Sequence, residues 1–409
     1  MELTYAKTRA DLEEIADLIA KTFVRRSYFD FYDQRMRYQE MDPWFKPERS
    51  RIIREGGRIV SHISIIEKRV WIGPAEVKVA GIGDVCTHPR ARGKGYARLL
   101  MEDALRYMAE HGYPMSMLYG IPNFYHKFGY IEAVRDTKWL LYAHRIPEPA
   151  GEYRLRPMRA GDLPALMDLY RRNFSGLNLC VIRNEAYWHR VLPDLSRVQV
   201  LLDGSGKVCG YAHLKDDITG AFVVNEAAAL NRDAGIALLH KVWLLAPEPR
   251  PVRLEVRLSP RAPLAAWLAD LSSEWHIRTF GAGEGQGMLA LISLRRALEA
   301  LAPVLSQRLK RSYYSGLTGR LIIQTEQGRE NLVLDRGDIT IGEAYSANIP
   351  GLGGLKTDSR FFVRNLVGFW SIPSLLQSGQ AGVRGKEAEA LLAVLFPEDE
   401  PFMLPLDYF

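Results

Sequence analysis

The sequence predicts an α/β protein in which two similar α/β domains are followed by a smaller α+β domain. The chain has 409 residues, more than the ~250–300 residues that one hydrophobic core usually serves. Its hydrophobic fraction of 47% and charged fraction of 25% are those of an ordinary globular protein. An internal repeat, and a change of pattern after it, place the three domains at residues 1–148, 149–294 and 295–409.

The repeat begins with a helix. Residues 8–23 resemble residues 158–174, and each segment has an aspartate near its start and apolar residues at helical spacing. Leu12 and Leu163, which correspond, are 151 positions apart.

The repeat continues with a strand. Residues 56–63 parallel residues 206–213, and each segment is typical of a hairpin turn followed by a strand. Ile59 and Val208 are 149 positions apart, close to the offset of the helices. Two features that recur in order predict a duplicated domain.

A glycine-rich basic loop in residues 80–101 is the richest motif of the chain. An apolar strand is predicted to end near Thr87, and a helix is predicted from about residue 96 to 109, with Arg92-Gly93-Lys94-Gly95 between them. The N-terminus of a helix offers unpaired N–H groups to phosphates, and glycine lets the backbone approach the ligand. The motif is neither a P-loop nor a dinucleotide fingerprint.

The second domain lacks this loop. Residues 225–239 contain no glycine pair and only Arg232 as a nearby base. We therefore expect this domain to bind no cofactor and to be structural.

The third domain has a different pattern. Residues 294–310 predict an amphipathic helix, and alternation around two turns predicts strands within 317–327 and 330–342. Two further helices are predicted, one opened by Asp358 and one over 388–395.

Charge and cysteine content exclude several classes. The net charge of +6 is small for this length, and the densest basic cluster alternates with glycine, so we expect a small anionic ligand and no nucleic acid. Three cysteines form no CxxC pair, which predicts no disulfide framework and no metal site. No signal segment or membrane span is found, and a cytoplasmic protein is expected.

Two motifs give the chain its resemblance to a known family. Residues 92–97 match the R/Q-x-x-G-x-G/A loop of the GNAT acetyltransferases, and residues 120–130 resemble the Y-x-K/R-F-G-Y/F signature of the same superfamily. The resemblance implies an N-acetyltransferase with acetyl-CoA as cosubstrate and two GNAT-type mixed-sheet domains in tandem. It places Tyr125 as the general acid. It assigns pantetheine to the backbone of Val85, Cys86 and Thr87, and pyrophosphate to Arg92 and the amides of Gly93, Lys94, Gly95, Tyr96, Ala97 and Arg98. The Cys86 side chain is expected to fill the strand and not to act as a nucleophile.

The whole chain resembles the Eis (enhanced intracellular survival) family, whose third domain is similar to sterol carrier proteins. The resemblance implies a homohexamer, and it places the α-carboxylate of Phe409 in the active site as the base. Asp84 is the alternative base. Tyr408 departs from the best-known pattern of that family, which has an acid beside the last residue.

The acceptor is expected to be an amine of a polycationic small molecule, similar to an aminoglycoside or a polyamine. Residues 24–46 mix aromatic and acidic side chains, which suits a cationic acceptor but equally an amphipathic helix with a solvated face. A protein or peptide lysine acetyltransferase is the first alternative function. A lipid-binding protein that uses the third domain is the second, although Arg360 and Arg364 favour a filled interface there.

Overall fold

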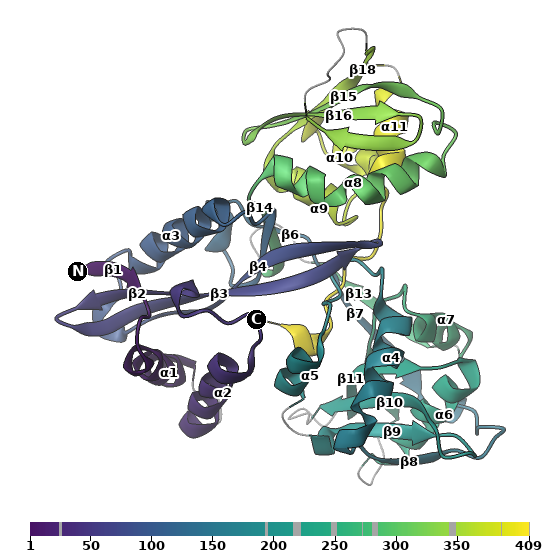
Figure 1. Ribbon diagram of the computed structural model, residues 1–409. Coiled ribbons are helices and arrows are strands. Elements are labelled where there is room, and N and C mark those ends of the chain that lie inside the picture. The colour runs from purple at the N-terminus through teal and green to yellow at the C-terminus, as the bar shows by residue number, and fades with distance from the viewer. Residues whose placement is uncertain are drawn as a thin grey trace. The chain divides into compact units, whose positions relative to one another are not determined.

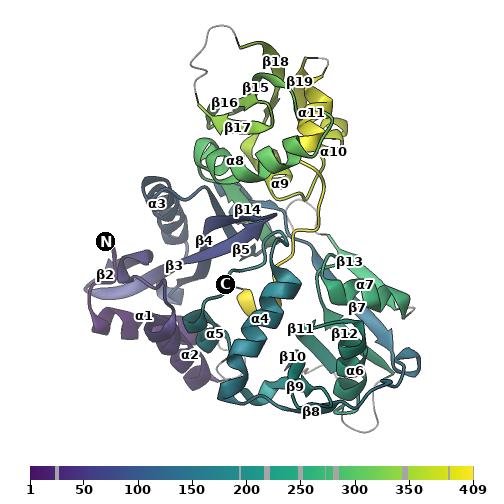
Figure 2. The same cartoon turned by 45° about the vertical axis from the view of Figure 1, so that its right-hand side comes forward.

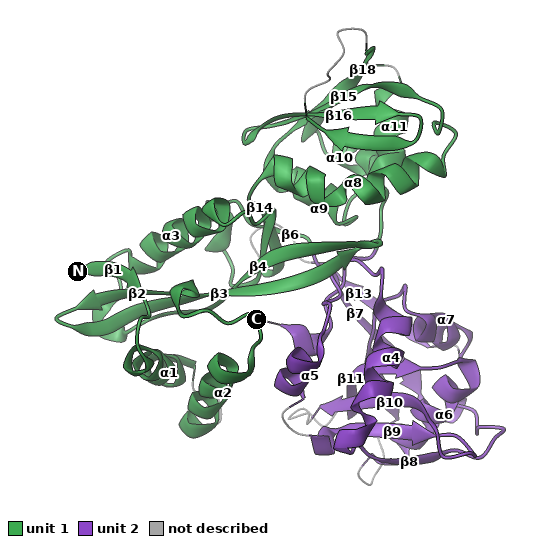
Figure 3. Ribbon diagram, viewed as in Figure 1, with its two compact units in different colours: residues 1–133, 280–399, 409 green, residues 134–279, 400–408 purple. Residues whose placement is uncertain are grey.

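A computed structural model describes residues 1–23, 27–192, 195–215, 222–246, 252–271, 273–279, 285–342, 349–385 and 387–408. Contacts divide the chain into two compact units (Figure 3). Unit 1 comprises residues 1–133, 280–399 and 409, and unit 2 comprises residues 134–279 and 400–408. Each unit is described by itself.

Unit 1 begins with a seven-stranded mixed sheet in the order β1-β2-β3-β4-β5-β14-β6 (Figure 1). Within it, β4 and β5 are parallel and the other neighbours are antiparallel. The strands are β1 (Glu2–Tyr5), β2 (Ser50–Glu55), β3 (Arg58–Ile72), β4 (Ala75–Thr87), β5 (Met115–Gly120), β6 (Ile131–Glu132) and β14 (Gln286–Leu291).

Helices cover both faces of this sheet. On one face, α3 (Tyr96–Glu110) packs on a core that includes Ile53, Ile63 and Ile82. On the other face, α1 (Arg9–Phe23) buries its apolar stripe against Ile52 and Ile59, and α2 (Tyr28–Met41) follows α1 (Figure 1). The alternation of Ile52 and Ile53 between the two cores is the period-2 pattern of a strand buried on both faces.

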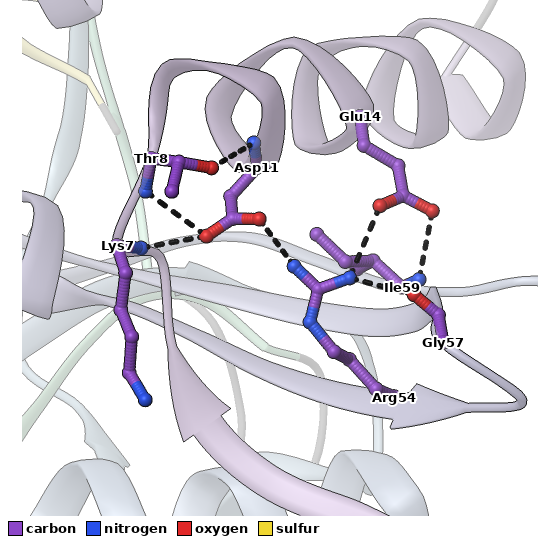
Figure 4. A network of polar contacts seen from close by, with 7 residues as sticks. All are labelled: Lys7, Thr8, Asp11, Glu14, Arg54, Gly57 and Ile59. Atoms are coloured by element: carbon purple, nitrogen blue, oxygen red, sulfur yellow. Dashed lines mark hydrogen bonds and ion pairs between the residues drawn. The ribbon is translucent and has the colours of Figure 1, made fainter.

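The start of α1 is tied to the β2–β3 hairpin by a polar network (Figure 4). Thr8 Oγ1 accepts a hydrogen bond from Asp11 N at 3.1 Å, and Asp11 Oδ2 accepts one from Thr8 N at 3.0 Å, which is a reciprocal capping arrangement. Arg54 pairs with Asp11 and lies 3.3 Å from Glu14. The helix predicted within residues 8–23 is therefore confirmed.

The remainder of unit 1 is an α+β region with a five-stranded sheet in the order β17-β16-β15-β18-β19. Its longest helix, α8 (Leu294–Lys310), lies across β16 and β17 (Figure 2). The predicted helices over 294–310 and 388–395 are confirmed, and one of the two expected turns lies at Arg336-Gly337. The other elements are β15 (Thr318–Thr325), β16 (Gly328–Asp335), β17 (Asp338–Ile341), β18 (Gly351–Thr357), β19 (Ala381–Arg384), α9 (Ser359–Leu366), α10 (Ile372–Gln377) and α11 (Ala388–Leu395).

Unit 2 contains a second seven-stranded mixed sheet, in the order β13-β7-β12-β11-β10-β9-β8. Its strands are β7 (Asp136–Tyr142), β8 (Arg154–Pro157), β9 (Val198–Leu202), β10 (Val208–Lys215), β11 (Phe222–Ala229), β12 (Arg253–Arg257) and β13 (Glu274–Arg278). Its helices are α4 (Leu163–Phe174), α5 (Glu185–Val191), α6 (Arg232–Trp243) and α7 (Pro263–Asp270).

The two seven-stranded sheets repeat one topology, with an exchange of one strand. Each has four antiparallel strands, and the fourth of them also forms a parallel pair with the next strand, to which a helix joins it; this motif is β4-α3-β5 in unit 1 and β11-α6-β12 in unit 2. The next position holds β14 in unit 1 and β7 in unit 2. The predicted duplication is thus confirmed. Strand β7, from the predicted first domain (1–148), pairs with β12, and β14, from the predicted second domain (149–294), pairs with β5. This exchange depends on contacts between segments that are distant in sequence.

Candidate active site

The parallel pair β4–β5 opens at its C-terminal end. Pairing runs from Val79 with Met115 to Ile82 with Leu118. Strand β4 continues to Thr87, where it is paired with Ser61 of β3. Among the described strands, the end of β4 therefore has a neighbour on one side, and its other edge can receive an extended ligand as an added strand.

A β-bulge marks the place where the strands diverge. Ser64 is opposite Gly83 and His62 is opposite Cys86, so that Asp84 and Val85 share one position opposite β3. Asp84 has φ of +53°, a conformation that costs free energy for a residue other than glycine. Bulges of this kind bend a strand and recur beside active sites.

The side chains of the predicted pantetheine strand are divided between the two cores. Cys86 is buried in the core with α1, and Val85 packs against the core with α3. Burial raises the pKa of the Cys86 thiol, and the nearby Asp84 charge adds to this rise. A buried thiol that keeps its proton is not a nucleophile, which agrees with Cys86 as a strand filler.

The loop before α3 leaves the helix N-terminus open. Gly93 and Gly95 both have φ of +78°, and a Cβ at either position would meet nothing within 4 Å. Gly95 is the N-cap of α3 and has no side chain that could accept a hydrogen bond. The N–H groups of the first turn, from Tyr96, Ala97 and Arg98, therefore have no side-chain acceptor at the N-cap. Glycine is required here by the backbone conformation and not by internal crowding.

The cations of this loop differ in their environment. Lys94 Nζ lies 2.9 Å from Glu55 Oε2, and Tyr96 donates its hydroxyl to the same carboxylate. Hydrogen bonds from Tyr96 and then Lys94 lower the pKa of Glu55, so the pair stays ionised at neutral pH. Arg92 donates Nε to Thr87 O at 3.3 Å and forms no ion pair with a described carboxylate. It is therefore better placed than Lys94 to neutralise an anion.

Unit 2 closes the corresponding helix end with its own side chain. Only Leu230 and Asn231 separate β11 from α6, and Asn231 Oδ1 accepts a hydrogen bond from Ala234 N at 3.0 Å. This cap satisfies an N–H group that α3 leaves open. The cap gives a physical reason for the expectation that the second domain binds no cofactor.

Tyr125 lies at the end of β5. It begins the short 3₁₀ helix η3 (Tyr125–Phe128) and is 8% exposed. A Cβ on Gly120 would lie 2.8 Å from its ring, so glycine at 120 makes the space for this side chain. Within the described residues, its hydroxyl forms no hydrogen bond. Burial raises the pKa of Tyr125 to about 12, which keeps the phenol protonated at neutral pH.

Asp84, the alternative base, is already engaged. Its carboxylate pairs with the Arg35 guanidinium of α2 and accepts a hydrogen bond from Ser64 Oγ at 3.1 Å. His62 Nδ1 lies 3.3 Å from Asp84 O, and burial lowers the pKa of His62 to about 4, so that this imidazole is neutral at pH 7. Sequence reasoning missed Arg35, because only its position on the inner side of α2 distinguishes it from the exposed Arg37.

The predicted acceptor segment forms α2, although residues 24–26 lie outside the described part. Phe29 is 74% exposed, and Tyr28 donates its hydroxyl to Asp17 Oδ1 at 2.8 Å. The acidic side chains Asp30 and Asp33 are exposed. Their exposure is that of a solvated helix face, the alternative interpretation of this segment.

The C-terminal tail docks on unit 2 as far as it is described, and Phe409 itself lies outside the described residues. Phe402 N donates to Asn178 O at 3.0 Å. Phe402, Met403 and Leu404 are 0–1% exposed, and the short helix η7 (Pro405–Asp407) follows them. Bulky apolar residues and prolines favour docking of a tail, and the structure shows these apolar residues buried.

A buried arginine anchors this tail. Arg183 donates Nε to Asp407 Oδ1 at 3.0 Å and Nη2 to Asp407 Oδ2 at 2.8 Å. It also pairs with both oxygens of Glu226 at 2.9 and 2.7 Å, and its guanidinium lies 4.3 Å from the ring centroid of Tyr170. Sequence reasoning missed Arg183, since nothing local links residues 183, 226 and 407.

The comparisons with known proteins agree with this arrangement. Residues 5–133 match the family described as acetyltransferase (GNAT) domain. The GCN5-related N-acetyltransferases from Anabaena variabilis and Kribbella flavida are similar over 100% of both chains, with 19% and 20% identity and TM-scores of 0.75 and 0.73. Eis1 from Mycobacterium abscessus is 15% identical over 100% of both chains, with a TM-score of 0.67. The search of curated proteins found no match.

The chain therefore carries a GNAT acetyltransferase domain over residues 5–133, and its fold is that of Eis1 and the GCN5-related enzymes. The expected fold class, with two GNAT-type domains followed by an α+β domain, is confirmed. The expected class of enzyme, an acyl-CoA-dependent acetyltransferase, is confirmed as well. Across the described part of the chain, no helix has the length and apolar character needed to cross a membrane.

Proposed function

We propose that this chain transfers an acetyl group from acetyl-CoA to an amine of a polycationic small molecule similar to an aminoglycoside or a polyamine. The observation that carries the proposal is the open edge of β4 beside the uncapped N-terminus of α3. An extended amide-containing arm pairs with a strand edge, and a pyrophosphate suits a helix N-terminus. Both groups occur in coenzyme A.

In this proposal the backbone of Val85, Cys86 and Thr87 holds the pantetheine arm, and the amides of residues 93–98 hold the pyrophosphate. Arg92 supplies positive charge. The amine nitrogen attacks the thioester carbonyl carbon, a C–N bond forms and the C–S bond breaks. The amine proton goes to a base, and the leaving sulfur takes a proton or a hydrogen bond from an acid. Transfer is direct, within a ternary complex.

Tyr125 is the proposed acid. A pKa of about 12 makes this phenol a weaker acid than a free one, whose pKa is about 10. It therefore acts by donating a hydrogen bond to the negative charge that develops on sulfur as the C–S bond breaks. Its side chain and the residues of α3 belong to one core.

The α-carboxylate of Phe409 is the proposed base. An α-carboxyl group has a pKa near ~3.3–3.7 and is ionised at neutral pH. One observation supports this choice over Asp84: the Asp84 carboxylate is already paired with Arg35.

A lysine of a peptide or protein is the alternative acceptor, and the same first domain would serve it. The lipid-binding alternative receives no support from the described part of the third domain. An open groove of about 640 Å³ runs beside α8, but Glu299, Lys310, Arg311 and Asp338 are among its lining residues. Charged walls do not suit an acyl chain.

The test is turnover of acetyl-CoA with polyamines, aminoglycosides and lysine peptides, for the wild-type chain and a chain extended by one glycine after Phe409. We expect turnover with polyamines or aminoglycosides, and its loss in the extended chain while CoA still binds. A harmless extension would make Asp84 the base. Turnover with lysine peptides alone would replace the proposed acceptor.

A further inference from the structure

One buried carboxylate joins the turn of Tyr125 to the third domain, and its hydrogen bonds and ion pairs with described residues lie within unit 1. Glu132 is the last residue of β6 and is 1% exposed. Its Oε1 lies 2.8 Å from Nε2 of His126, the residue after Tyr125, and accepts a hydrogen bond from Gly285 N at 3.1 Å. The carboxylate therefore contacts both the turn η3 and the chain that enters β14.

The third contact comes from helix α9. Arg364 donates Nε to Glu132 O at 2.8 Å, and its Nη2 lies 3.9 Å from Glu132 Oε2. Arg364 is 6% exposed, and its guanidinium lies 4.4 Å from the ring centroid of Trp370. An aromatic face and an acid therefore hold this cation in place.

Burying the Arg364–Glu132 ion pair costs desolvation free energy. Two charges are taken out of water, and a buried pair at 3.9 Å repays that cost only in part. An arginine that spans from α9 to the backbone and carboxylate of Glu132 fixes where η3 stands. Gly120 of β5 lies against the Tyr125 ring, since a Cβ at this position would come within 2.8 Å of it. The ring is thus set between β5 and a turn that the third domain holds.

We propose that Arg364 is a positioning residue for the acid Tyr125, acting through Glu132 and His126, so that the third domain is part of the catalytic apparatus of the first. The expected effect of Arg364 on kcat rests on the proposed function. The structural part of the proposal, the fixing of the turn at 124–132 by Arg364, stands independently of any acceptor.

The matched control is Arg360, which lies on the same helix. Its side chain is 45% exposed and its ion pair is with Asp358 at 2.7 Å, at the N-cap of its own helix. Arg364→Met and Arg360→Met thus remove the same charge from the same element, and only the first removes the contact with Glu132. If Arg364→Met fails to fold, the double variant Arg364→Met/Glu132→Gln is used in its place, because it leaves no unpaired charge buried at this position.

Hydrogen–deuterium exchange of the peptides covering residues 124–132 is the first readout. We expect faster exchange in Arg364→Met and the wild-type rate in Arg360→Met. The second readout is kcat, which we expect to fall ~10- to 100-fold in Arg364→Met, since a displacement of about 1 Å can cost as much. The Kd of CoA should change less than ~2-fold.

The same substitutions in a Tyr125→Phe background separate positioning from general damage. If Arg364 acts through Tyr125, its loss costs nothing more once the phenol is absent. Unchanged exchange at 124–132, or an equal fall of kcat in both backgrounds, overturns the proposal. A chain that acetylates no amine yet shows the difference in exchange contradicts the proposed function and leaves Arg364 as the residue that fixes the turn.

Discussion

Replacing Gly95 by alanine separates the cost of backbone strain from the loss of a phosphate site. Gly95 has φ of +78°, and a Cβ there would meet nothing within 4 Å. The substitution therefore adds no internal clash. It should lower the free energy of unfolding only by the cost of the left-handed conformation for alanine, about 1–2 kcal/mol. The new methyl group projects into the space before the first turn of α3, where we place the pyrophosphate.

Gly379→Ala is the matched control. Gly379 also belongs to unit 1, has φ of +71° and has nothing within 4 Å of its Cβ position, but it follows α10 in the third domain. Both variants should lose about 1–2 kcal/mol of unfolding free energy. Calorimetric titration with CoA should show a Kd at least ~10-fold weaker for Gly95→Ala, which corresponds to ~1.4 kcal/mol, and the wild-type Kd for Gly379→Ala. Equal CoA affinities in the two variants would refute the assignment of this helix end to phosphate.

Three further predictions follow from the site. Tyr125→Phe should lower kcat ~100-fold and leave the Kd of CoA unchanged; in the wild type, kcat should show no loss of the acid between pH 7 and 10. The raised pKa means that the folded chain holds the Tyr125 proton more tightly than the unfolded chain, so the contribution of this group to stability is complete below pH ~10 and is lost as pH rises through about 12. A spectrophotometric titration of the phenol checks this pKa. A decline of kcat near pH 9 that is absent from Tyr125→Phe would oppose it. Asp407→Asn should lower the unfolding free energy by ~1–3 kcal/mol in denaturant titration, because Arg183 loses one of its two carboxylates, and it should lower kcat; normal kcat in a folded variant would argue against the terminal carboxylate as the base. Cys86→Ala should retain kcat within ~2-fold, and a thiol-specific reagent should label Cys86 in the wild type only after unfolding; rapid inactivation by that reagent would contradict the buried position.

Local sequence patterns were sufficient to predict most of the fold and the cofactor loop of the site. The glycines of the loop, the strand before it and the helix after it lie within residues 75–110, and local patterns predict such elements well. The helices over 294–310 and 388–395 were predictable for the same reason: their apolar residues recur at helical spacing. The docking of the tail followed from its run of apolar residues.

Contacts between distant segments were not predictable. The residue pattern of β7 or β14 would fit either seven-stranded sheet, so the sequence could not predict that β7 completes the sheet of unit 2 and β14 that of unit 1. Arg183, Glu226 and Asp407 form a cluster only after folding, as do Arg364 and Glu132. The ion pair between Lys94 and Glu55 of the neighbouring hairpin was not predictable either.

The most direct test of the central claim is mass spectrometry of the acceptor after incubation with acetyl-CoA, for the wild-type chain and for Tyr125→Phe. The account predicts an amine heavier by one acetyl group, with one free CoA thiol released for each acetyl transferred, and a rate lower by about two orders of magnitude in Tyr125→Phe. Release of CoA without an acetylated amine, or the same rate in both chains, would contradict it.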